Sequence, residues 1–346
     1  GFMKKLTIGM ATFDDFEGVF FTIQAIRLAN LDILDDLDFI VLDNRPDSHE
    51  GKATKDFCEK AGVRYIPETQ RRSTAIRTRI FELAEAEVAL SIDPHVLLEP
   101  GTIKRLIEYF EDNTTLQLVH GPMLYDQIKG HDPACKMDPV WRDNMFGTWQ
   151  CDERGNDPEG DPFEIEMMGL GLFACRVDVW PGFHPLFKGF GGEEGYIHEK
   201  IRQMGGVILC LPFLRWVHRF QRPRGLSYPL IIEERIANYL IGWRELDIPP
   251  DDIISHFGET HPNVPVADLI LPQVDEALEL FERDPEKTLE AWHKDDENGK
   301  VVSFLKKDIT LETWNQTDVN LGSPLKIEID GKILAIRSFG LSWASD

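Results

Sequence analysis

Residues Val88–His95 read VALSIDPH, an apolar run that ends in an acid, a proline and a histidine. In an extended segment, residues two apart project from the same side, so Asp93 and His95 can reach toward one point. An acid and an imidazole that converge in this way suit a divalent cation. Taken alone, an Asp-x-His sequence at a strand end more often marks a turn with a surface histidine, so the hypothesis depends on the rest of the chain.

Apolar runs alternate with segments of helical periodicity on both sides of this stretch. The patterns predict strands and helices in turn, with strands over 4–13, 38–44, 63–68 and 88–95 and helices over 19–30, 53–62, 74–86 and 100–112. Such alternation predicts a mostly parallel central sheet flanked by helices, an α/β fold. Ligands of such sheets lie beyond the carboxyl ends of the strands, where Thr12, Asp43 and Asp93 fall.

The second half of the chain begins with an irregular stretch, 121–165, that is rich in Pro, Gly, Asp and aromatic residues. We expect it to form strands and loops that cross the sheet edge. The segments that follow predict a helix from Glu193 to Gly205, a buried strand that ends at His218, and an amphipathic helix over 231–246. Glu193 and Glu194 would lie at the start of their helix, where negative charge is favourable.

The helical signal weakens after about Asp247, and the tail 324–340 reads as a hairpin that turns at Asp330-Gly331. We therefore expect a main domain over 3–246 and a helical and β-hairpin extension over 247–346. No internal repeat is visible in the sequence.

The composition limits the class of protein. A formal net charge of −23 disfavours broad attachment to nucleic acid or anionic membrane. Five widely spaced cysteines without a CxxC pair indicate a reducing compartment. No run of 18 apolar residues occurs, and the two residues before Met3 read as a cloning remnant. We expect a cytoplasmic protein without a membrane span.

Six segments, in this order, resemble the motifs of one enzyme family: ATFDD (11–15), VLDN (41–44), TAIRTR (74–79), SIDPH (91–95), GFGGEEGYIHEKIRQMGG (189–206) and WVHRF (216–220). Together they resemble the glycosyltransferases with the GT-A fold, most closely the retaining polypeptide N-acetylgalactosaminyltransferases. The resemblance runs from about Thr7 to Leu246. Phe190 stands where the family has tryptophan, and Glu194 where it has asparagine. The loop RFQRPRGLSYP (219–229) does not match closely.

This resemblance implies a UDP-sugar donor and a Mn²⁺ or Mg²⁺ ion held by Asp93, His95 and His218. It implies contacts to donor sugar hydroxyls from Glu193. It places nucleotide contacts at Thr12, Phe13, Asp43, Arg77 and Asp93 and, in the loop after His218, at Arg222, Arg224 and Tyr228. The Asp-x-His motif points to transfer with retention. The sequence GGEE also resembles inverting transferases, in which Glu194 would deprotonate the acceptor hydroxyl.

We therefore predict a metal-dependent glycosyltransferase. A divalent ion on both phosphates stabilises the charge that builds on the leaving diphosphate. The main alternative is an inactive GT-A-like binding or scaffold protein, against which the intact motifs argue. A nucleotidyltransferase should carry a glycine-rich basic loop after the first strand, where this chain has the acidic ATFDDFEG.

The acceptor stays open at this stage: a protein, a glycan, a small molecule or a modified DNA base. The last is kept open by two local basic clusters, RRSTAIRTR (71–79) and RFQRPR (219–224). The absence of a lectin-like domain and of a secretory anchor in this sequence argues against a Golgi-type mucin acceptor. The oligomeric state is not predicted.

Overall fold

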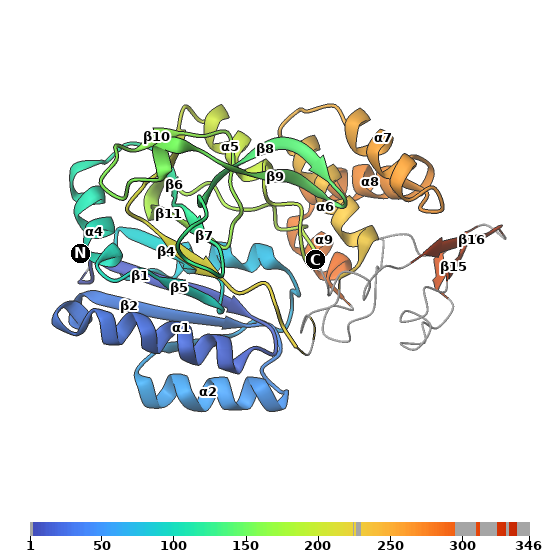
Figure 1. The fold of residues 1–346 in the computed structure, drawn as a ribbon. Coiled ribbons are helices and arrows are strands. Elements are labelled where there is room, and N and C mark those ends of the chain that lie inside the picture. Colours follow the sequence, from blue (N-terminus) through green and yellow to red (C-terminus); the bar gives the residue numbers. More distant parts are fainter. Residues whose placement is uncertain are drawn as a thin grey trace.

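A computed structural model describes residues 3–223, 225, 230–294, 309–311, 324–329 and 332–337. Its main sheet has eight strands (Figure 1). From edge to edge these are β10 (Phe163–Glu164), β12 (Val207–Cys210), β6 (Gln117–His120), β11 (Leu172–Arg176), β4 (Val88–Ile92), β1 (Leu6–Thr12), β2 (Leu37–Asp43) and β3 (Arg64–Pro67). β1 pairs in parallel with β2 and β4, whereas β11 lies antiparallel between β4 and β6. The predicted α/β sheet is confirmed as a mixed sheet that is parallel around β1.

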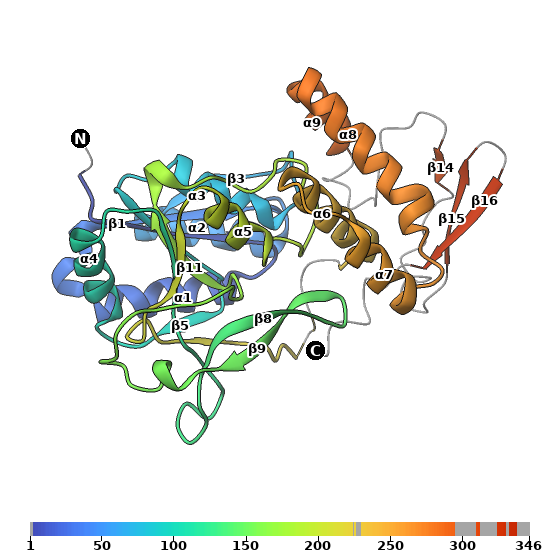
Figure 2. The ribbon, with the colours of Figure 1, turned by 90° about the horizontal axis from the view of Figure 1, so that it is seen from above.

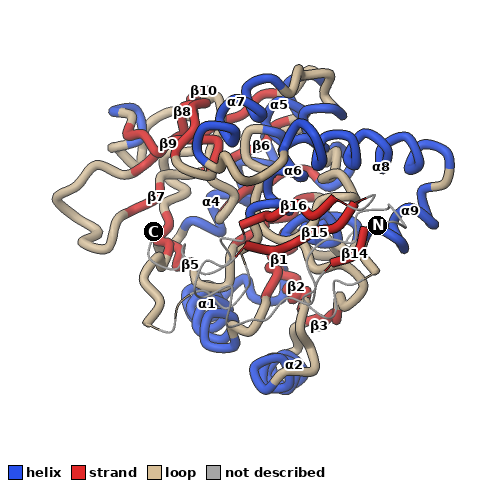
Figure 3. The backbone as a smooth tube through the Cα atoms, turned by 90° about the vertical axis from the view of Figure 1, so that its right-hand side faces the viewer, coloured by secondary structure: helices blue, strands red, loops and turns tan. Residues whose placement is uncertain are grey.

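Helices α1 (Phe16–Ala29) and α2 (His49–Ala61) lie together on one side of β1 and β2 (Figures 1 and 3). Local sequence sets where each begins, because Asp15 and Ser48 accept the N–H groups of Gly18 and Gly51 as N-caps. The remaining helical segments up to residue 205 are η1 (Leu31–Asp36), η2 (Thr74–Arg77), α3 (Thr78–Glu82), α4 (Thr102–Asp112), η3 (Glu153–Gly155), η4 (Val177–Val179) and α5 (Tyr196–Gln203).

The predicted helix over 74–86 is wrong in length and type. The chain forms a 3₁₀ turn, η2, and then the short α3, which ends at Glu82. The Arg77 guanidinium donates to the Thr74 carbonyl oxygen at 2.8 Å, the group that a regular α-helix would bond to Thr78. The Thr78 N–H bonds the carbonyl oxygens of Ala75 and Ile76 instead, which is the pattern of a tighter turn.

A second sheet of five strands lies beside the first. Its strands, in order, are β5 (Val96–Leu98), β13 (Trp216–His218), β7 (Met123–Leu124), β8 (Ala134–Arg142) and β9 (Met145–Cys151). The single strand predicted to end at His218 is wrong, because β12 and β13 belong to different sheets. A turn in which Leu214 N–H donates to the Leu211 carbonyl separates them, and Pro212 lies within that turn.

The helices after residue 230 pack on one another at the end of the molecule opposite α4 (Figure 2). They are α6 (Ile232–Glu245), α7 (Asp251–Thr260), the π-helical η5 (Val266–Ile270), α8 (Leu271–Arg283) and α9 (Pro285–Trp292). The predicted amphipathic pattern of α6 is wrong, because nearly all of its residues are buried. Apolar residues of α6, α7, η5, α8 and Trp292 belong to the same connected core as the main sheet.

A third sheet is formed by β14 (Ile309–Leu311), β15 (Pro324–Ile329) and β16 (Lys332–Arg337). β15 and β16 pair antiparallel, with Ile329 opposite Lys332, which confirms the predicted hairpin. Its turn, Asp330-Gly331, lies outside the described residues. None of the helices in the described ranges has the length and apolar character that crossing a membrane requires.

Candidate metal and nucleotide site

Three potential metal ligands meet where the two sheets join. Asp93 and His95 lie in the short connection between β4 and β5, and His218 ends β13. β13 runs antiparallel to β5, which places His218 opposite Val96 and next to His95. The ligand atoms of the three side chains all lie within 4.8 Å of one another. The structure thus brings together the three residues that the sequence predicted to share a site.

The surroundings of Asp93 and His95 keep these two side chains in the forms that bind a cation. Burial raises the pKa of Asp93, but His218, His95 and Arg77 more than offset this and hold it well below its usual range. Burial also lowers the pKa of His95, which favours the neutral ring. A carboxylate and a neutral imidazole are suitable donors for Mn²⁺.

Asp15 is a member of this site that sequence reasoning missed. Its Oδ2 lies 3.3 Å from Nδ1 of His95, while its Oδ1 caps α1. A carboxylate on the far nitrogen fixes the ring and leaves Nε2 to face the cluster, as in many metal centres. Asp15 is the last residue of the segment ATFDD, two residues after Phe13. The sequence signal for it was its position shortly before a predicted helix, where an aspartate can act as the N-cap.

A positive group stands beside the cluster. Nη2 of Arg222 lies 2.7 Å from Nε2 and 3.0 Å from Nδ1 of His95. Nε2 of His218 lies 3.0 Å from Nε2 of His95 and 3.4 Å from Oδ2 of Asp93. The guanidinium stands in for a cation at this point, so the donor set fits a metal ion.

A cavity of about 120 Å³ opens beside these ligands. Of the predicted nucleotide-contacting residues, the structure places Thr12, Phe13, Asp93, Arg77 and Arg222 in its wall. The Thr12 hydroxyl is buried and has no hydrogen-bond partner among the described residues. Such a group is expected to meet a ligand or an ordered water. Arg224 and Tyr228 lie outside the described residues.

Asp43 lies near the cavity without lining it. Its strand position is opposite Thr12, but Oδ1 accepts the backbone N–H of Arg45 and Oδ2 accepts the hydroxyl of Tyr65 at 2.6 Å. Burial raises the pKa of this carboxyl. Asn44, the next residue, lines the cavity instead. A nucleotide contact by Asp43 stays a prediction.

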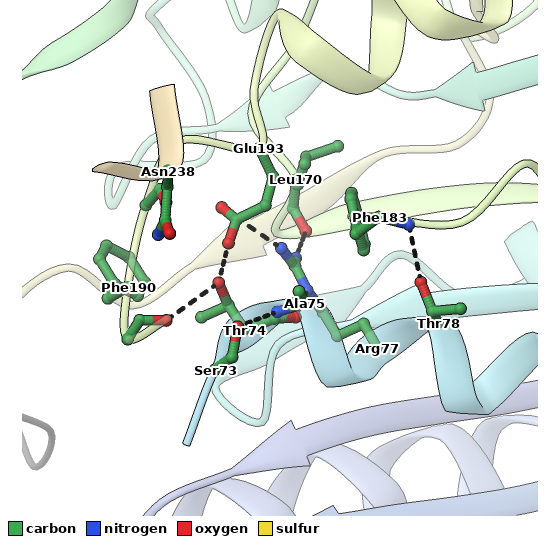
Figure 4. A network of polar contacts seen from close by, with 12 residues as sticks. Ser73, Thr74, Ala75, Arg77, Thr78, Leu170, Phe183, Phe190, Glu193 and Asn238 are labelled. Atoms are coloured by element: carbon green, nitrogen blue, oxygen red, sulfur yellow. Dashed lines mark hydrogen bonds and ion pairs between the residues drawn. The ribbon is translucent and has the colours of Figure 1, made fainter. Parts of the chain in front are cut away.

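Glu193 is held at the inner wall of the cavity (Figure 4). It accepts a hydrogen bond from the Thr74 hydroxyl, and its other oxygen lies 3.9 Å from Nη2 of Arg77. Arg77 also donates to the Leu170 carbonyl at 2.9 Å. Thr74, which sequence reasoning missed, therefore fixes Glu193 together with Arg77.

Glu194 lies in the same wall but does not start a helix. Helix α5 begins at Tyr196, so the expectation that Glu193 and Glu194 occupy its first turn is wrong. Burial, together with the charge of Glu193, raises the pKa of Glu194 to about 7. Its carboxyl is thus poised to gain or lose a proton near neutral pH.

The predicted basic cluster 71–79 is not an exposed positive patch. Arg72 pairs with Glu234 at 2.9 Å in the interior, and Arg79 pairs with Glu68 at 2.9 Å. Arg77 is buried as described above. Two of the four arginines in this segment are therefore buried, and Arg79 is paired with a carboxylate.

No protein-family model matches the chain, and no curated protein matches it. Its structure is similar to that of GalNAc-T7 with UDP, GalNAc and Mn²⁺, with a TM-score of 0.57 and 14% sequence identity over 94% of this chain and 65% of that one. The chain has the GT-A fold. It spans 65% of the length of the GalNAc-T7 chain, and the N-acetylgalactosaminyltransferase family stays a prediction at this identity.

Two further structures are similar at a TM-score of 0.46. One is the mannosyltransferase PcManGT from Pyrobaculum calidifontis in complex with GDP-Man and Mn²⁺, at 15% identity over 81% of this chain and 75% of that one. The other is residues 1–349 of TarS from S. aureus, at 11% identity over 96% and 99%.

Proposed function

We propose that the protein is a metal-dependent glycosyltransferase that transfers a sugar from a UDP-sugar to an acceptor. The observation that carries this proposal is the convergence of Asp93, His95 and His218 in a GT-A fold, beside a cavity that Asp93 and His95 line. A Mn²⁺ or Mg²⁺ ion held there would neutralise the charge that grows on the leaving diphosphate. The GalNAc-T7 structure, which contains UDP and Mn²⁺, supports this assignment.

The residues around the cluster have separate roles in this proposal. Asp15 orients His95 through its Nδ1. Arg222, which lines the cavity beside His95, would add fixed positive charge near the donor phosphates once a cation is bound. Thr12 and Phe13 bound the nucleotide pocket, while Glu193 binds donor sugar hydroxyls.

The test is nucleotide release from a panel of UDP-, GDP- and dTDP-sugars with Mn²⁺. We expect release from a UDP-sugar, and we expect His218→Ala to abolish it without loss of the fold. Full activity of the His218→Ala variant would overturn the metal assignment. Metal-dependent UDP binding without release from any donor would favour the alternative of an inactive nucleotide-sugar-binding or scaffold protein.

We propose that transfer proceeds with retention, because the Asp-x-His, AIRTR and WVHRF segments all resemble one retaining family. Inversion is the second candidate, and one observation favours it: Glu194 lines the cavity with a pKa of about 7, which suits a general base. Proton NMR of the first-formed product distinguishes the two. An α-linked donor that yields a β-anomeric product would establish inversion.

The acceptor class remains a matter for experiment among proteins, glycans, small molecules and modified DNA bases. The buried pair of Arg72 with Glu234 and the pair of Arg79 with Glu68 weaken the case for a nucleic-acid acceptor at the segment 71–79. Net charge disfavours a polyanionic acceptor as well. We propose a cytoplasmic location, as the sequence predicts.

A further inference from the structure

The loop that carries Glu193 and Glu194 has a backbone that only glycine adopts readily. Gly191 and Gly192 have φ angles of 97° and 98°, and Gly195 has 79°. These values lie in the region that residues with a side chain avoid. A loop of this kind has no regular hydrogen-bond ladder, so other groups must hold its shape.

One buried side chain from helix α6 holds the entry of the loop. Asn238 donates through Nδ2 to the carbonyl oxygens of Lys188 at 2.6 Å and Gly191 at 2.8 Å. Its Oδ1 accepts the Lys188 N–H at 2.8 Å. Asn238 is fully buried. A Cβ atom added to Gly192 would lie 2.7 Å from the Cβ atom of Asn238. Figure 4 shows Asn238 beside Phe190, on the side of the loop away from Arg77.

A buried imidazole holds the exit of the loop. Nδ1 of His198 accepts the Gly195 N–H at 3.0 Å, so the ring carries its proton on Nε2. That nitrogen lies 3.0 Å from Nε2 of His120, whose Nδ1 faces the Leu172 carbonyl oxygen at 3.0 Å. Met168 N–H approaches the same His198 nitrogen at 3.3 Å.

One arrangement of protons satisfies the three contacts of 3.0 Å and leaves the longer Met168 contact without an acceptor. His120 donates from Nδ1 to Leu172, and His198 donates from Nε2 to His120. Both rings are then neutral, and both are fully buried. His198 thereby links strands β6 and β11 to the residue that directly follows Glu194.

We infer that Asn238 and His198 are positioning residues that hold the loop from Gly189 to Gly195, and with it Glu193, in the geometry required for sugar transfer. This inference rests on the proposed function. Neither side chain lines the cavity, so each acts through the loop backbone. A displacement of about 1 Å in a reacting group can lower a rate about 10²-fold.

The first test is Asn238→Asp, which keeps the size of the side chain and removes both donated hydrogen bonds. We expect kcat for nucleotide release to fall about 10- to 100-fold. UDP affinity with Mn²⁺ should stay within about twofold, because Asp93, His95 and Thr12 lie on other elements. The matched control is Asn30→Asp, a buried asparagine at the end of α1 whose Nδ2 bonds the Ile26 carbonyl. It should leave kcat unchanged.

The second test uses a conservative pair at His198, which keeps the inference testable if Asn238→Asp does not fold. His198→Asn retains an acceptor near Nδ1 for the Gly195 N–H, whereas His198→Leu removes it. We expect Asn to restore most of the kcat that Leu loses, at equal UDP affinity.

The outcomes separate the inference from the proposed function. If the wild-type protein releases no nucleotide from any donor, the proposed function falls and the inference with it. If wild-type turnover is normal and folded Asn238→Asp matches it, the inference alone is overturned. Equal kcat values for folded His198→Asn and His198→Leu would also overturn it.

Discussion

At the residue scale, Asp93, His95 and His218 converge where the two sheets join. Asp93 and His95 directly follow the apolar strand β4 and His218 ends β13, so the sequence pattern could predict a shared site at these strand ends. The three side chains come together because β5 pairs with β13, about 120 residues further along the chain. The periodicity of a single strand does not reveal which distant strand it pairs with. Asp15 and Thr74 were missed for the same reason, since each acts on a residue that is distant in sequence.

The role of Asp43 is testable at this scale. We expect Asp43→Asn to weaken UDP binding about 10-fold or more, because a hydrogen bond to a charged group contributes about 1.5–3 kcal/mol. Isothermal titration calorimetry measures the affinity. The matched control is Tyr65→Phe, which removes the internal partner of Asp43 and should leave UDP affinity intact. An unchanged UDP affinity in Asp43→Asn would contradict the predicted nucleotide contact. The carboxylate of Asp43 would then serve only to join β2 to β3 through Tyr65.

The raised pKa of Glu194 predicts a pH-dependent stability. The folded state binds the proton up to about pH 7, whereas an unfolded glutamate releases it near its ordinary pKa of 4.5. Wild-type stability should therefore fall as pH rises from about 4.5 to 7. We expect Glu194→Gln to melt at a higher temperature than wild type at pH 8, with the difference vanishing below about pH 4.5. A difference that does not change with pH would contradict the shifted pKa.

The same variant bears on the stereochemical proposal. With retention, Glu194→Gln should keep measurable turnover. If Glu194 is a general base, the substitution should lower turnover about 10²–10⁴-fold. Single-turnover measurements with the best donor distinguish the two results.

At the element scale, the segment before η2 is fixed by a buried ion pair. Arg72 donates to both carboxylate oxygens of Glu234, which lies in the first turn of α6. Sequence periodicity predicted one helix over 74–86, directly after this segment, and it could not show that Arg72 would pair with a residue 162 positions away. The helices α1 and α2 were predictable because their apolar spacing and N-caps are local.

Removal of one partner of this pair should be strongly destabilising. We expect Arg72→Met to lower the free energy of unfolding by about 3–5 kcal/mol, because Glu234 then remains buried without this partner. The double variant Arg72→Met/Glu234→Gln should recover part of the loss. Arg79→Met serves as the control, since Arg79 is more exposed and its pairs with Glu68 and Glu82 should each contribute at most about 1 kcal/mol. Denaturant unfolding measures all three, and equal losses for Arg72→Met and Arg79→Met would contradict this account.

At the scale of the whole molecule, the sequence predicted the α/β class and the hairpin of the tail, but not how the helices after residue 246 attach. Trp292 is buried and donates from Nε1 to the Leu186 carbonyl, while Lys188 donates to the Trp292 carbonyl at 2.6 Å. These contacts join α9 to the segment that leads into the Glu193 loop. Long-range contacts of this kind leave no periodic pattern in the sequence.

Trp292→Ala tests whether the predicted extension behaves as part of the main domain. We expect a loss of about 3–5 kcal/mol in a single unfolding transition that includes the main sheet. Leu31→Ala, at a position with 66% of its surface exposed, should change stability little. A separate low-temperature transition with an unchanged main transition would instead favour an independent unit over 247–346.

The central claim is that Asp93, His95 and His218 hold a catalytic cation beside the nucleotide. Electron paramagnetic resonance of Mn²⁺ with UDP, in the wild-type protein and in His218→Ala, tests it most directly. We predict one tightly bound Mn²⁺ per wild-type chain and a loss of affinity of about tenfold or more in His218→Ala, because three protein ligands fall to two. Equal Mn²⁺ stoichiometry and affinity in the two proteins would contradict the claim.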